Sequence, residues 1–365
     1  MNRSAWEYFD FILLGLVATL VIFGIAVIRS AIAGNVVLGG LVKRQIIFAV
    51  LGFGILIATA AIDYHYWSAF GKYLYIATVF LLAALGIVGK AAFGSARWID
   101  TGVFFIQPSE IAKIVMILVL ADFFANHRHQ LHEFRWVVMS FVLTMGLVVW
   151  ILIQPDLSTS ITVLVIWFGM LWVAGLTWKH LAVFAAIGAV TPFLAWPFLA
   201  AYQKARVLNF LFPNPNARHG AIYNVQQALI SLGSGGLFGQ GYGHGTQVQL
   251  RFLKVRHTDF IFSVIGEEFG FIGTVFVVVM LGLILWRIFR IARTAHDTFG
   301  ALIAYGIGIM LFFHMAVNIA MNINLIPVTG LPLPFITYGG SSLLSALLGI
   351  GLVESVAMRR EPLSF

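Results

Sequence analysis

The sequence predicts an all-α, polytopic membrane protein with about ten transmembrane helices and a long extracytoplasmic loop between the seventh and eighth. Of the 365 residues, 61% are hydrophobic and 10% are charged, whereas soluble domains average about 25% charged residues. The mean hydropathy is +0.96. The chain also contains apolar runs long enough to cross a hydrocarbon core of about 30 Å, and such runs must be helical because lipid cannot satisfy backbone hydrogen bonds. These runs cover residues 9–28, 45–62, 73–89, 108–125, 137–153, 158–175, 181–200, 260–286, 299–321 and 341–357.

The chain is expected to form one domain over residues 1–365, because it shows neither repeats nor low-complexity tails. Its first apolar run is long enough to span and lacks a clear signal-peptide cleavage site, so it is predicted to be a retained anchor. Cysteine is absent from the sequence, which excludes disulfides and thiolate nucleophiles or metal ligands.

Lysine and arginine in short loops predict the orientation of the helices. If both termini are cytoplasmic, the two sides carry similar numbers of these residues, and a cytoplasmic excess emerges only when residues 201–257 are set aside. We therefore expect both termini inside and a basic loop outside. Such a loop is unexpected unless it binds something anionic. Its basic residues are Lys204, Arg206, Arg218, Arg251, Lys254 and Arg256.

The connection over residues 201–258 is too long for a simple link, which favours a functional role. Within it, residues 222–232 are predicted to form a short amphipathic helix at the membrane interface. The thirteen residues 233–245 contain seven glycines. Such a segment can present backbone N–H groups to phosphate oxygens, but it lacks the Gly-Lys-Ser/Thr ending of a nucleotide-binding loop. A flexible loop is the alternative interpretation.

Ionisable residues within the apolar runs are candidates for function. Glu110 and Lys113 stand three apart and share a helix face. A structural ion pair and a substrate contact both remain open, and either places the pair inside the bundle. Asp156 stands where the fifth run turns into the sixth, so it suits a helix N-cap, with a substrate contact as the alternative.

The ninth run carries a polar stripe, because His314, Asn318 and Asn322 recur every fourth residue. Hydrogen bonding between helices is the simplest explanation. The segment 327–342 that follows contains three prolines and cannot form a continuous helix. Irregular backbone at membrane depth must line a cavity or be buried in protein, so a re-entrant loop is predicted here.

Asp259 stands at the mouth of the eighth run, in the sequence Arg256-His257-Thr258-Asp259-Phe260. A carboxylate at the edge of a membrane must be protonated, paired with another group or used in the function of the protein, because an isolated charge removed from water costs several kcal/mol. A charge that satisfies free N–H groups at a helix N-terminus is one interpretation. Catalysis is the other.

Taken in order, these segments resemble the SEDS family of bacterial cell-wall proteins, which comprises RodA, FtsW and SpoVE-like relatives, and Arg256 before His257 is most like RodA. Two departures are Ser158, where many relatives carry glycine, and the altered run before Arg97. The matching blocks are Gly94–Asp100 with Gln107–Lys113, Pro155–Thr159, Ser231–Leu237, Arg256–Phe262 and Pro327–Ser342.

The resemblance implies a peptidoglycan glycosyltransferase, a hexosyl-type transferase, that polymerises lipid II into glycan strands for cell elongation and shape. Lipid II is undecaprenyl-pyrophosphate disaccharide pentapeptide, and polymerisation would take place at the outer face of the bacterial cytoplasmic (inner) membrane. The implied partners are a class B penicillin-binding protein transpeptidase and the elongation machinery. By the motif match, Asp259 corresponds to the family's essential aspartate, and Trp98, Glu110 and Lys113 correspond to positions important for activity.

The implied reaction suits a site with a single carboxylate. Pyrophosphate is a good leaving group, so no acid must protonate it, unlike in glycosidases. Asp259 would accept the proton of the attacking hydroxyl, or hold a divalent cation, Mg²⁺ or Mn²⁺. No organic cofactor and no nucleic-acid partner are expected. The candidate substrate-binding residues are Arg97, Trp98, Glu110, Lys113, Asp156, Lys204, Arg206, Arg256, His257 and Thr258.

Two other functions remain open. A lipid-linked precursor flippase or transporter would use the stripe of His314, Asn318 and Asn322 along a path through the membrane. A non-catalytic scaffold for a penicillin-binding protein would not need the carboxylate of Asp259.

Overall fold

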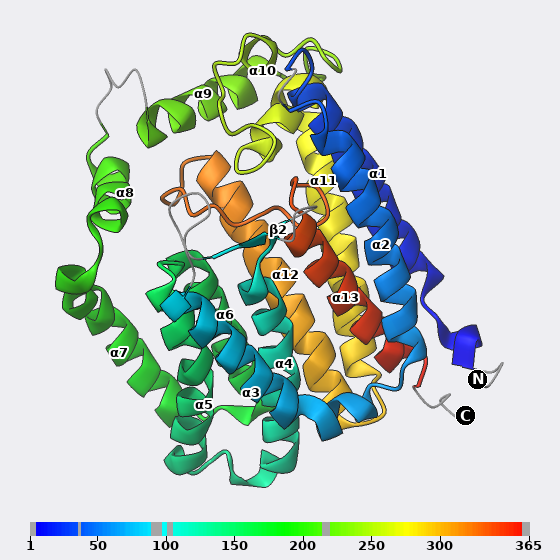
Figure 1. Cartoon of the computed structure of the whole chain (residues 1–365), viewed down its shortest axis with the longest axis vertical. Helices are drawn as coiled ribbons and strands as arrows, with labels where there is room; N and C mark the ends of the chain where they lie inside the picture. The colour runs from blue at the N-terminus through cyan, green and yellow to red at the C-terminus, as the bar shows by residue number, and fades with distance from the viewer. Residues whose placement is uncertain (1–4, 36–37, 89–96, 101–104, 214–219, 360–365) are drawn as a thin grey trace.

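Ten long helices run side by side through the computed structural model, which describes residues 5–35, 38–88, 97–100, 105–213 and 220–359 (Figure 1). Each helix overlaps one predicted run, which confirms the polytopic helical fold. The helices are α1 (Phe11–Ala31), α2 (Leu41–Ala61), α3 (His65–Val88), α4 (Pro108–Asn126), α5 (Phe134–Ile153), α6 (Leu157–Gly175), α7 (Trp178–Ala195), α11 (Ile261–Arg293), α12 (Thr298–Asn322) and α13 (Gly340–Ala357).

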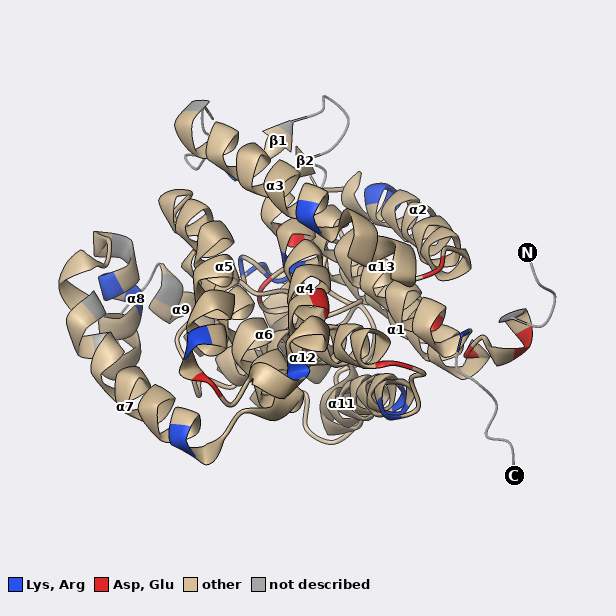
Figure 2. Cartoon of the chain, turned by 90° about the horizontal axis from the view of Figure 1, so that it is seen from below, with Lys and Arg blue, Asp and Glu red and all other residues tan. Residues whose placement is uncertain are grey.

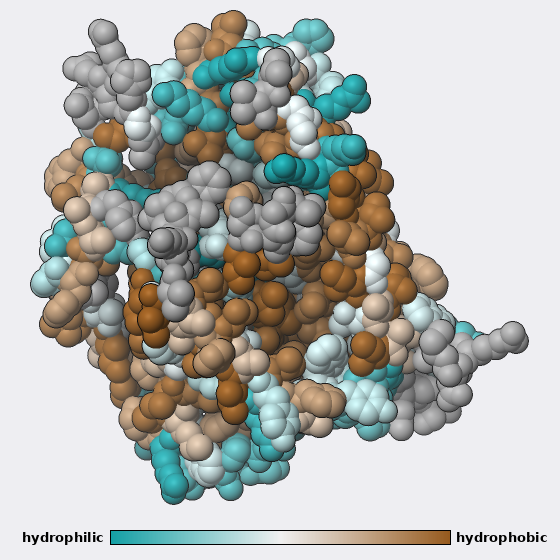
Figure 3. Space-filling view, in the orientation of Figure 1, coloured by the Kyte–Doolittle hydropathy of each residue, from teal (hydrophilic) through white to brown (hydrophobic). Residues whose placement is uncertain are grey.

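Eight of these helices are long and apolar enough to cross a membrane by length and composition alone. The other two are α4, which carries the charged residues Glu110, Lys113 and Asp122, and α7, whose apolar stretch Trp178–Thr191 is shorter. On the face shown in Figure 3, an apolar band lies between hydrophilic ends, and Lys, Arg, Asp and Glu are sparse along the helices (Figure 2). Both termini lie at the same end of the bundle (Figure 1), as an even number of spans requires.

The centre of the bundle is formed by α12 and α13, the two most buried of the membrane-spanning candidates. Helix α12 packs against α4, α6, α11 and α13, and α13 packs along α2. The α2–α13 contact depends on Gly351, where a Cβ atom would lie 2.7 Å from the carbonyl oxygen of Leu56. Helix α7, by contrast, stands at the side of the bundle (Figure 1).

Shorter elements complete the described chain. The long connection contains α8 (Ala201–Leu211), α9 (Ala221–Ser234) and α10 (Thr246–Gln249), and α9 confirms the helix predicted over residues 222–232. One feature departs from the all-α prediction, because β1 (Ile99–Asp100) pairs with β2 (Phe105–Ile106) in an antiparallel ladder. Strands of two residues are too short to leave a period-2 pattern in the sequence.

Helix α11 is interrupted at Gly270, whose φ of 67° and ψ of −162° are not helical. The glycine-rich segment 233–245 satisfies the backbone groups that the interruption frees. The N–H groups of Phe271 and Ile272 donate to the carbonyls of Gly236 and Leu237 at 2.9 and 3.2 Å. In return, the carbonyls of Glu267 and Glu268 accept from the N–H groups of Gln240 and Gly241 at 2.9 and 3.0 Å.

Two glycines of this segment allow its backbone to pack closely against the backbone of α11. A Cβ atom at Gly235 would lie 1.8 Å from the carbonyl oxygen of Gly266, and one at Gly239 would lie 2.2 Å from that of Glu268. The segment is therefore a packed brace on α11 rather than a flexible loop, and the N–H groups of Gln240 and Gly241 donate to α11.

Candidate active site

A cavity of about 560 Å³ opens in the half of the bundle away from the termini. Its wall combines the β1 segment and the first turns of α4, α6 and α8 with the turn before α11 and the irregular segment 327–339. Most of the predicted site residues meet there although they come from distant parts of the chain. Those that line the cavity are Arg97, Trp98, Glu110, Asp156, Arg206, Thr258 and Asp259.

Asp259 lies in the turn that leads into α11, and its position is fixed through its backbone. Its carbonyl oxygen accepts hydrogen bonds from the amide groups of Asn322 at 3.0 Å and Asn318 at 3.4 Å. The Oδ1 atom of Asn322 accepts from the N–H and the hydroxyl of Ser263 at 3.1 and 2.7 Å. Two turns of α12 thus hold the start of α11, and the Asp259 side chain lines the cavity.

The electrostatic environment of Asp259 favours a proton acceptor. Burial raises the pKa of its carboxyl group above the ordinary aspartate value, and the positive charge of Arg206 opposes that increase. A carboxylate whose pKa is raised toward neutrality is a better base.

The polar stripe on α12 is used in hydrogen bonds between elements, as predicted. Besides holding Asp259, Asn318 donates to the carbonyl of Leu331 at 2.8 Å, and both asparagines are fully buried. The stripe therefore joins α12 to α11 and to the proline-rich segment, the irregular residues 327–339. That segment meets both requirements for irregular backbone at this depth, since residues 327–332 line the cavity and Leu333, Phe335 and Ile336 are buried.

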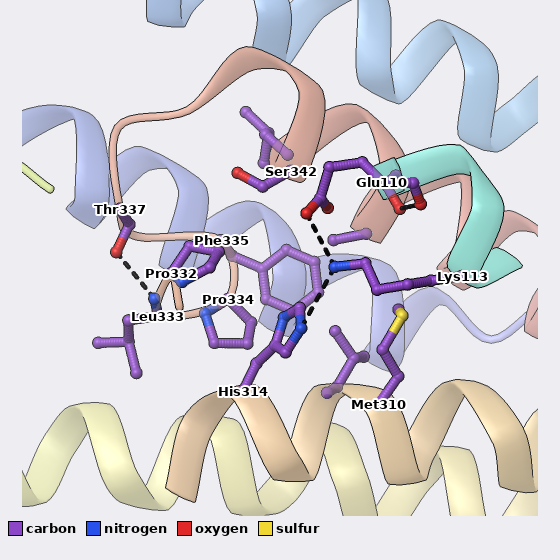
Figure 4. Close-up of a pocket in the computed structure, with 14 residues that line it drawn as sticks. Glu110, Lys113, Met310, His314, Pro332, Leu333, Pro334, Phe335, Thr337 and Ser342 are labelled. Carbon is purple, nitrogen blue, oxygen red and sulfur yellow. Dashed lines mark hydrogen bonds and ion pairs between the residues drawn. The ribbon is translucent and has the colours of Figure 1, made fainter. Parts of the chain in front are cut away.

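Glu110 and Lys113 form a buried ion pair, with 2.9 Å between Oε1 and Nζ. The Nζ atom of Lys113 also lies 3.3 Å from Nε2 of His314 on α12, in a small pocket walled by the proline-rich segment (Figure 4). When Lys113 is charged, this contact requires a neutral His314 that accepts at Nε2. Glu110 lines both this pocket and the large cavity. The ion pair therefore lies inside the bundle, and its Glu110 member forms part of the wall of the large cavity.

Asp156 is the N-cap of α6, as its position in the sequence predicted. Its Oδ1 atom accepts from the N–H of Thr159 at 3.2 Å, and Oδ2 accepts from the side-chain amide of Gln107 at 3.1 Å. Arg97 approaches the same turn, where Nε donates to the carbonyl of Gln154 at 2.9 Å and the guanidinium also donates to the carbonyl of Pro155. Arg97 and Asp156 thus shape one wall of the cavity.

Besides Lys113, which lines the small pocket, three predicted binding residues do not line this cavity in the described part of the chain. Arg256 is buried, and its guanidinium donates to the carbonyl of Ala31 at the end of α1 and to that of Leu253. Lys204 donates to the carbonyl of Pro197 at 3.2 Å. His257 is half-buried and bonds through its backbone carbonyl to the N–H of Tyr338 at 3.1 Å. Among the described residues of the long loop, Arg206 is therefore the cation that lines the cavity.

Several polar residues of the cavity wall were not predicted from the sequence. Ser341 accepts from the N–H of Gln107 at 3.0 Å and donates to the carbonyl of Phe105 at 3.2 Å, which joins α13 to β2 and α4. Gln107 and Ser341 both lie within the motif blocks, and that membership was the available signal. Gln203, Thr329 and Tyr338 also line the cavity.

Asp259 is the carboxylate available for a metal ion in the turn before α11. Within residues 5–359, apart from the stretches left undescribed, no group of three or more His, Asp or Glu side chains is arranged to hold an ion. A cage built only from protein ligands is thus not formed by these residues. A single carboxylate suits Mg²⁺, which commonly binds through one or two carboxylates together with phosphate oxygens and water.

The sequence profile of the family described as cell cycle protein, which covers FtsW, RodA and SpoVE, matches residues 9–361. The chain is 36% identical over 366 residues to the peptidoglycan glycosyltransferase MrdB of Escherichia coli (strain K12), covering 100% of this chain and 98% of that relative.

Solved structures agree with the sequence match. A chain from a study of how a peptidoglycan synthase complex coordinates polymerization and crosslinking aligns with a TM-score of 0.82 at 32% identity, over 96% of this chain and 97% of that one. The rod shape determining protein RodA of Thermus thermophilus aligns with a TM-score of 0.73 at 32% identity, over 98% and 99% of the two chains. The chain therefore belongs to the FtsW, RodA and SpoVE family of cell cycle proteins.

Proposed function

We propose that this protein is a peptidoglycan glycosyltransferase that polymerises lipid II at the outer face of the bacterial cytoplasmic membrane and serves cell elongation and shape. The observation that carries the proposal is the Asp259 carboxylate on the wall of a cavity of about 560 Å³ that also contains Arg97 and Arg206. The activity named for the MrdB relative, which matches the whole chain, supports it.

In the proposed reaction, a sugar hydroxyl of the acceptor attacks the anomeric carbon of the donor. A new C–O bond forms as the bond to the pyrophosphate oxygen breaks, and the polyprenyl pyrophosphate leaves with that electron pair. Asp259 accepts the hydroxyl proton as the new bond forms. Arg206 and Arg97 offset the negative charge that develops on the pyrophosphate.

The remaining residues of the cavity position the reacting groups. Trp98 is partly exposed at the cavity wall and offers an apolar face against which a sugar ring can pack. Glu110 presents a carboxylate at the cavity floor, where Lys113 fixes its orientation. If Mg²⁺ or Mn²⁺ takes part, Asp259 would hold it, and the ion would add positive charge beside the pyrophosphate.

The proposed orientation places both termini in the cytoplasm and the Asp259 cavity toward the outer face. The end of α4, the starts of α5 and α7 and the end of α11 lie at the end of the bundle that carries the termini (Figure 1), and Arg128, Arg135, Lys179 and Arg293 stand at these helix ends, as the positive-inside rule requires of the cytoplasmic end. We further propose a class B penicillin-binding protein as partner within the elongation machinery, because new glycan strands must be crosslinked. The similarity to a chain of a peptidoglycan synthase complex supports this partner.

A translocation pathway along His314, Asn318 and Asn322 is less well supported. These side chains already contact Lys113, Asp259, Ser263 and Leu331, and they are buried rather than spread along an open route. A flippase therefore has no specific observation in its favour.

Purified full-length protein supplied with purified lipid II tests the proposal. Glycan strands should form when this protein and its class B penicillin-binding protein are both present, and should not form when this protein is omitted. Lipid II that remains unpolymerised with both proteins folded would contradict the proposed activity.

A further inference from the structure

A second large cavity, of about 960 Å³, lies at the end of the bundle that carries the termini. It forms where the last residues of α4 and α6 meet the turn between α11 and α12, so it shares no lining residue with the Asp259 cavity. Its lining residues are Phe124, Arg128, His129, Leu131, His132, Val173, Ala174, Gly175, Ala292, Arg293, Ala295, His296, Asp297, Thr298, Ala301, Leu302 and Tyr305.

The rim of this cavity is basic. Arg128 and Arg293 are exposed, and His129, His132 and His296 stand beside them. Arg128 donates to the neutral hydroxyl of Thr298 at 3.3 Å, a contact that orients its guanidinium without neutralising it. Figure 2 views this end of the molecule and shows Lys and Arg at the ends of several helices.

The acidic residue in the wall, Asp297, is already engaged in holding helices together. Its Oδ1 atom accepts from the hydroxyl of Tyr64 at 2.7 Å and from the N–H of Gly300 at 3.0 Å. Its Oδ2 atom lies 3.4 Å from Nε2 of His65. Asp297 keeps its single negative charge, but Arg128 and Arg293 outnumber it, so the cavity keeps a net positive charge toward an incoming ligand.

The floor of the cavity is apolar and continues toward the lipid-facing surface. Phe124, Leu131 and Leu302 are buried there, whereas Val173 on α6 is exposed. Trp172 and Trp178 are exposed beside it, with ring centroids 6.3 Å apart. Tryptophan side chains gather at the level of lipid headgroups, so the cavity opens at that depth.

We propose that this cavity binds the headgroup of an anionic glycerophospholipid from the adjoining leaflet. The phosphate would lie between Arg128 and Arg293, and an acyl chain would follow the apolar surface beside Val173. Basic pockets between transmembrane helices on the cytoplasmic side suit anionic headgroups, and the volume falls within the roughly 300 to 1,000 Å³ of small-molecule sites. This inference goes beyond the proposed glycosyltransferase activity and does not rest on it, because the two cavities lie at opposite ends of the bundle.

Thermal unfolding and native mass spectrometry of the full chain in neutral detergent test the proposal. Phosphatidylglycerol should raise the melting temperature and remain bound in the spectrometer, whereas phosphatidylcholine and glycerol 3-phosphate should do neither. The double variant Arg128→Gln/Arg293→Gln loses charge-assisted contacts to the phosphate. Its binding of phosphatidylglycerol should therefore be about tenfold to a hundredfold weaker. Each single variant should show a smaller loss.

The matched control is Arg135→Gln/Lys179→Gln, which removes two exposed charges from the same end without touching the cavity. This control should bind phosphatidylglycerol as the unaltered protein does. Equal binding of phosphatidylcholine, equal losses in the two double variants, or undiminished binding in Arg128→Gln/Arg293→Gln would overturn the proposal. Equal stabilisation by glycerol 3-phosphate would replace the lipid with a free phosphate ligand.

Discussion

The side-chain amide of Asn322 on α12 lies 3.0 Å from the backbone carbonyl oxygen of Asp259, the residue proposed as the base. The same side chain accepts two hydrogen bonds from Ser263 in the first turn of α11. The position of Asp259 therefore depends on a second helix as well as on its own. Because Asn318 adds a bond to Leu331, α12 aligns two walls of the cavity at once.

Asn322→Ala is expected to lower the turnover number by mispositioning Asp259. It also removes the buried hydrogen bonds that Asn322 makes with Asp259 and Ser263, each worth about 0.5 to 1.5 kcal/mol of folding free energy. Steady-state turnover and thermal unfolding should be measured together with the control Asn126→Ala, which changes an exposed residue at the far end of α4. A variant that melts early but turns over normally below its melting temperature would refute the positioning role.

Glu110→Gln and Lys113→Met should each cost folding stability strongly, because breaking a buried ion pair leaves an uncompensated charge worth about 3 to 5 kcal/mol. The double variant removes both charges and should recover most of the lost stability. Since Glu110 also lines the cavity, the double variant should still polymerise lipid II poorly. Melting curves and turnover of all three variants measure this, and full activity in the double variant would reduce the pair to a structural role.

Arg206→Gln is expected to weaken substrate binding or turnover about tenfold to a hundredfold, through loss of a charge-assisted contact with the pyrophosphate. Lys204→Gln is the matched control on the same helix, because its side chain bonds to Pro197 outside the cavity. Both are compared by turnover against lipid II concentration at constant ionic strength. Equal kinetics for the two variants would contradict a pyrophosphate contact at Arg206.

The pH dependence of turnover should follow the carboxyl group of Asp259. Its deprotonated form is the active base, so activity should fall as the pH drops through a midpoint above the ordinary aspartate pKa of about 3.9. Arg206 opposes the increase, so Arg206→Gln should move the midpoint to higher pH. A midpoint that is the same in both proteins would argue against this coupling.

The raised pKa also predicts how folding stability responds to pH. A group with a raised folded-state pKa contributes stability below its unfolded pKa, and this contribution is lost as the pH rises through the folded-state value. The charged carboxylate of Asp259 thus costs stability at neutral pH. Asp259→Asn should therefore melt no lower than the unaltered protein at neutral pH, as thermal unfolding will show.

Gly239→Ala should destabilise the fold by about 1 to 3 kcal/mol, because φ is +81° and the added Cβ would lie 2.2 Å from the carbonyl oxygen of Glu268. Gly233→Ala is the control, since this glycine lies within α9 with no neighbouring atom in reach of a Cβ. Thermal unfolding should separate the two variants. Similar melting temperatures would show that segment 233–245 does not brace α11.

The sequence predicted features that depend on local patterns. Apolar runs located the helices, the i, i+3 spacing placed Glu110 beside Lys113, and the turn between two runs identified Asp156 as an N-cap. Even local patterns misplaced some boundaries. The third run was expected to begin after Lys72, but α3 begins at His65, and Lys72 lies within it against the ring of Tyr73.

Features set by contacts distant in sequence could not be predicted. Arg256 stands beside Asp259 in the chain, yet its guanidinium turns to the carbonyl of Ala31 on α1, a partner that sequence alone cannot supply. The glycine-rich segment looked like a loop because its partner, the interrupted backbone of α11 at Gly270, exists only in the folded protein. Residues 94–96 of the first motif block and Arg218 lie outside the described residues.

Polymerisation of purified lipid II by Asp259→Asn tests the central claim most directly. The substitution is nearly isosteric and removes the proton acceptor, so the variant should fold normally and form no glycan strands. Turnover and melting temperature should be measured on the same preparation, beside the unaltered protein. A folded variant with near-normal turnover would contradict the role of Asp259 as base or metal ligand.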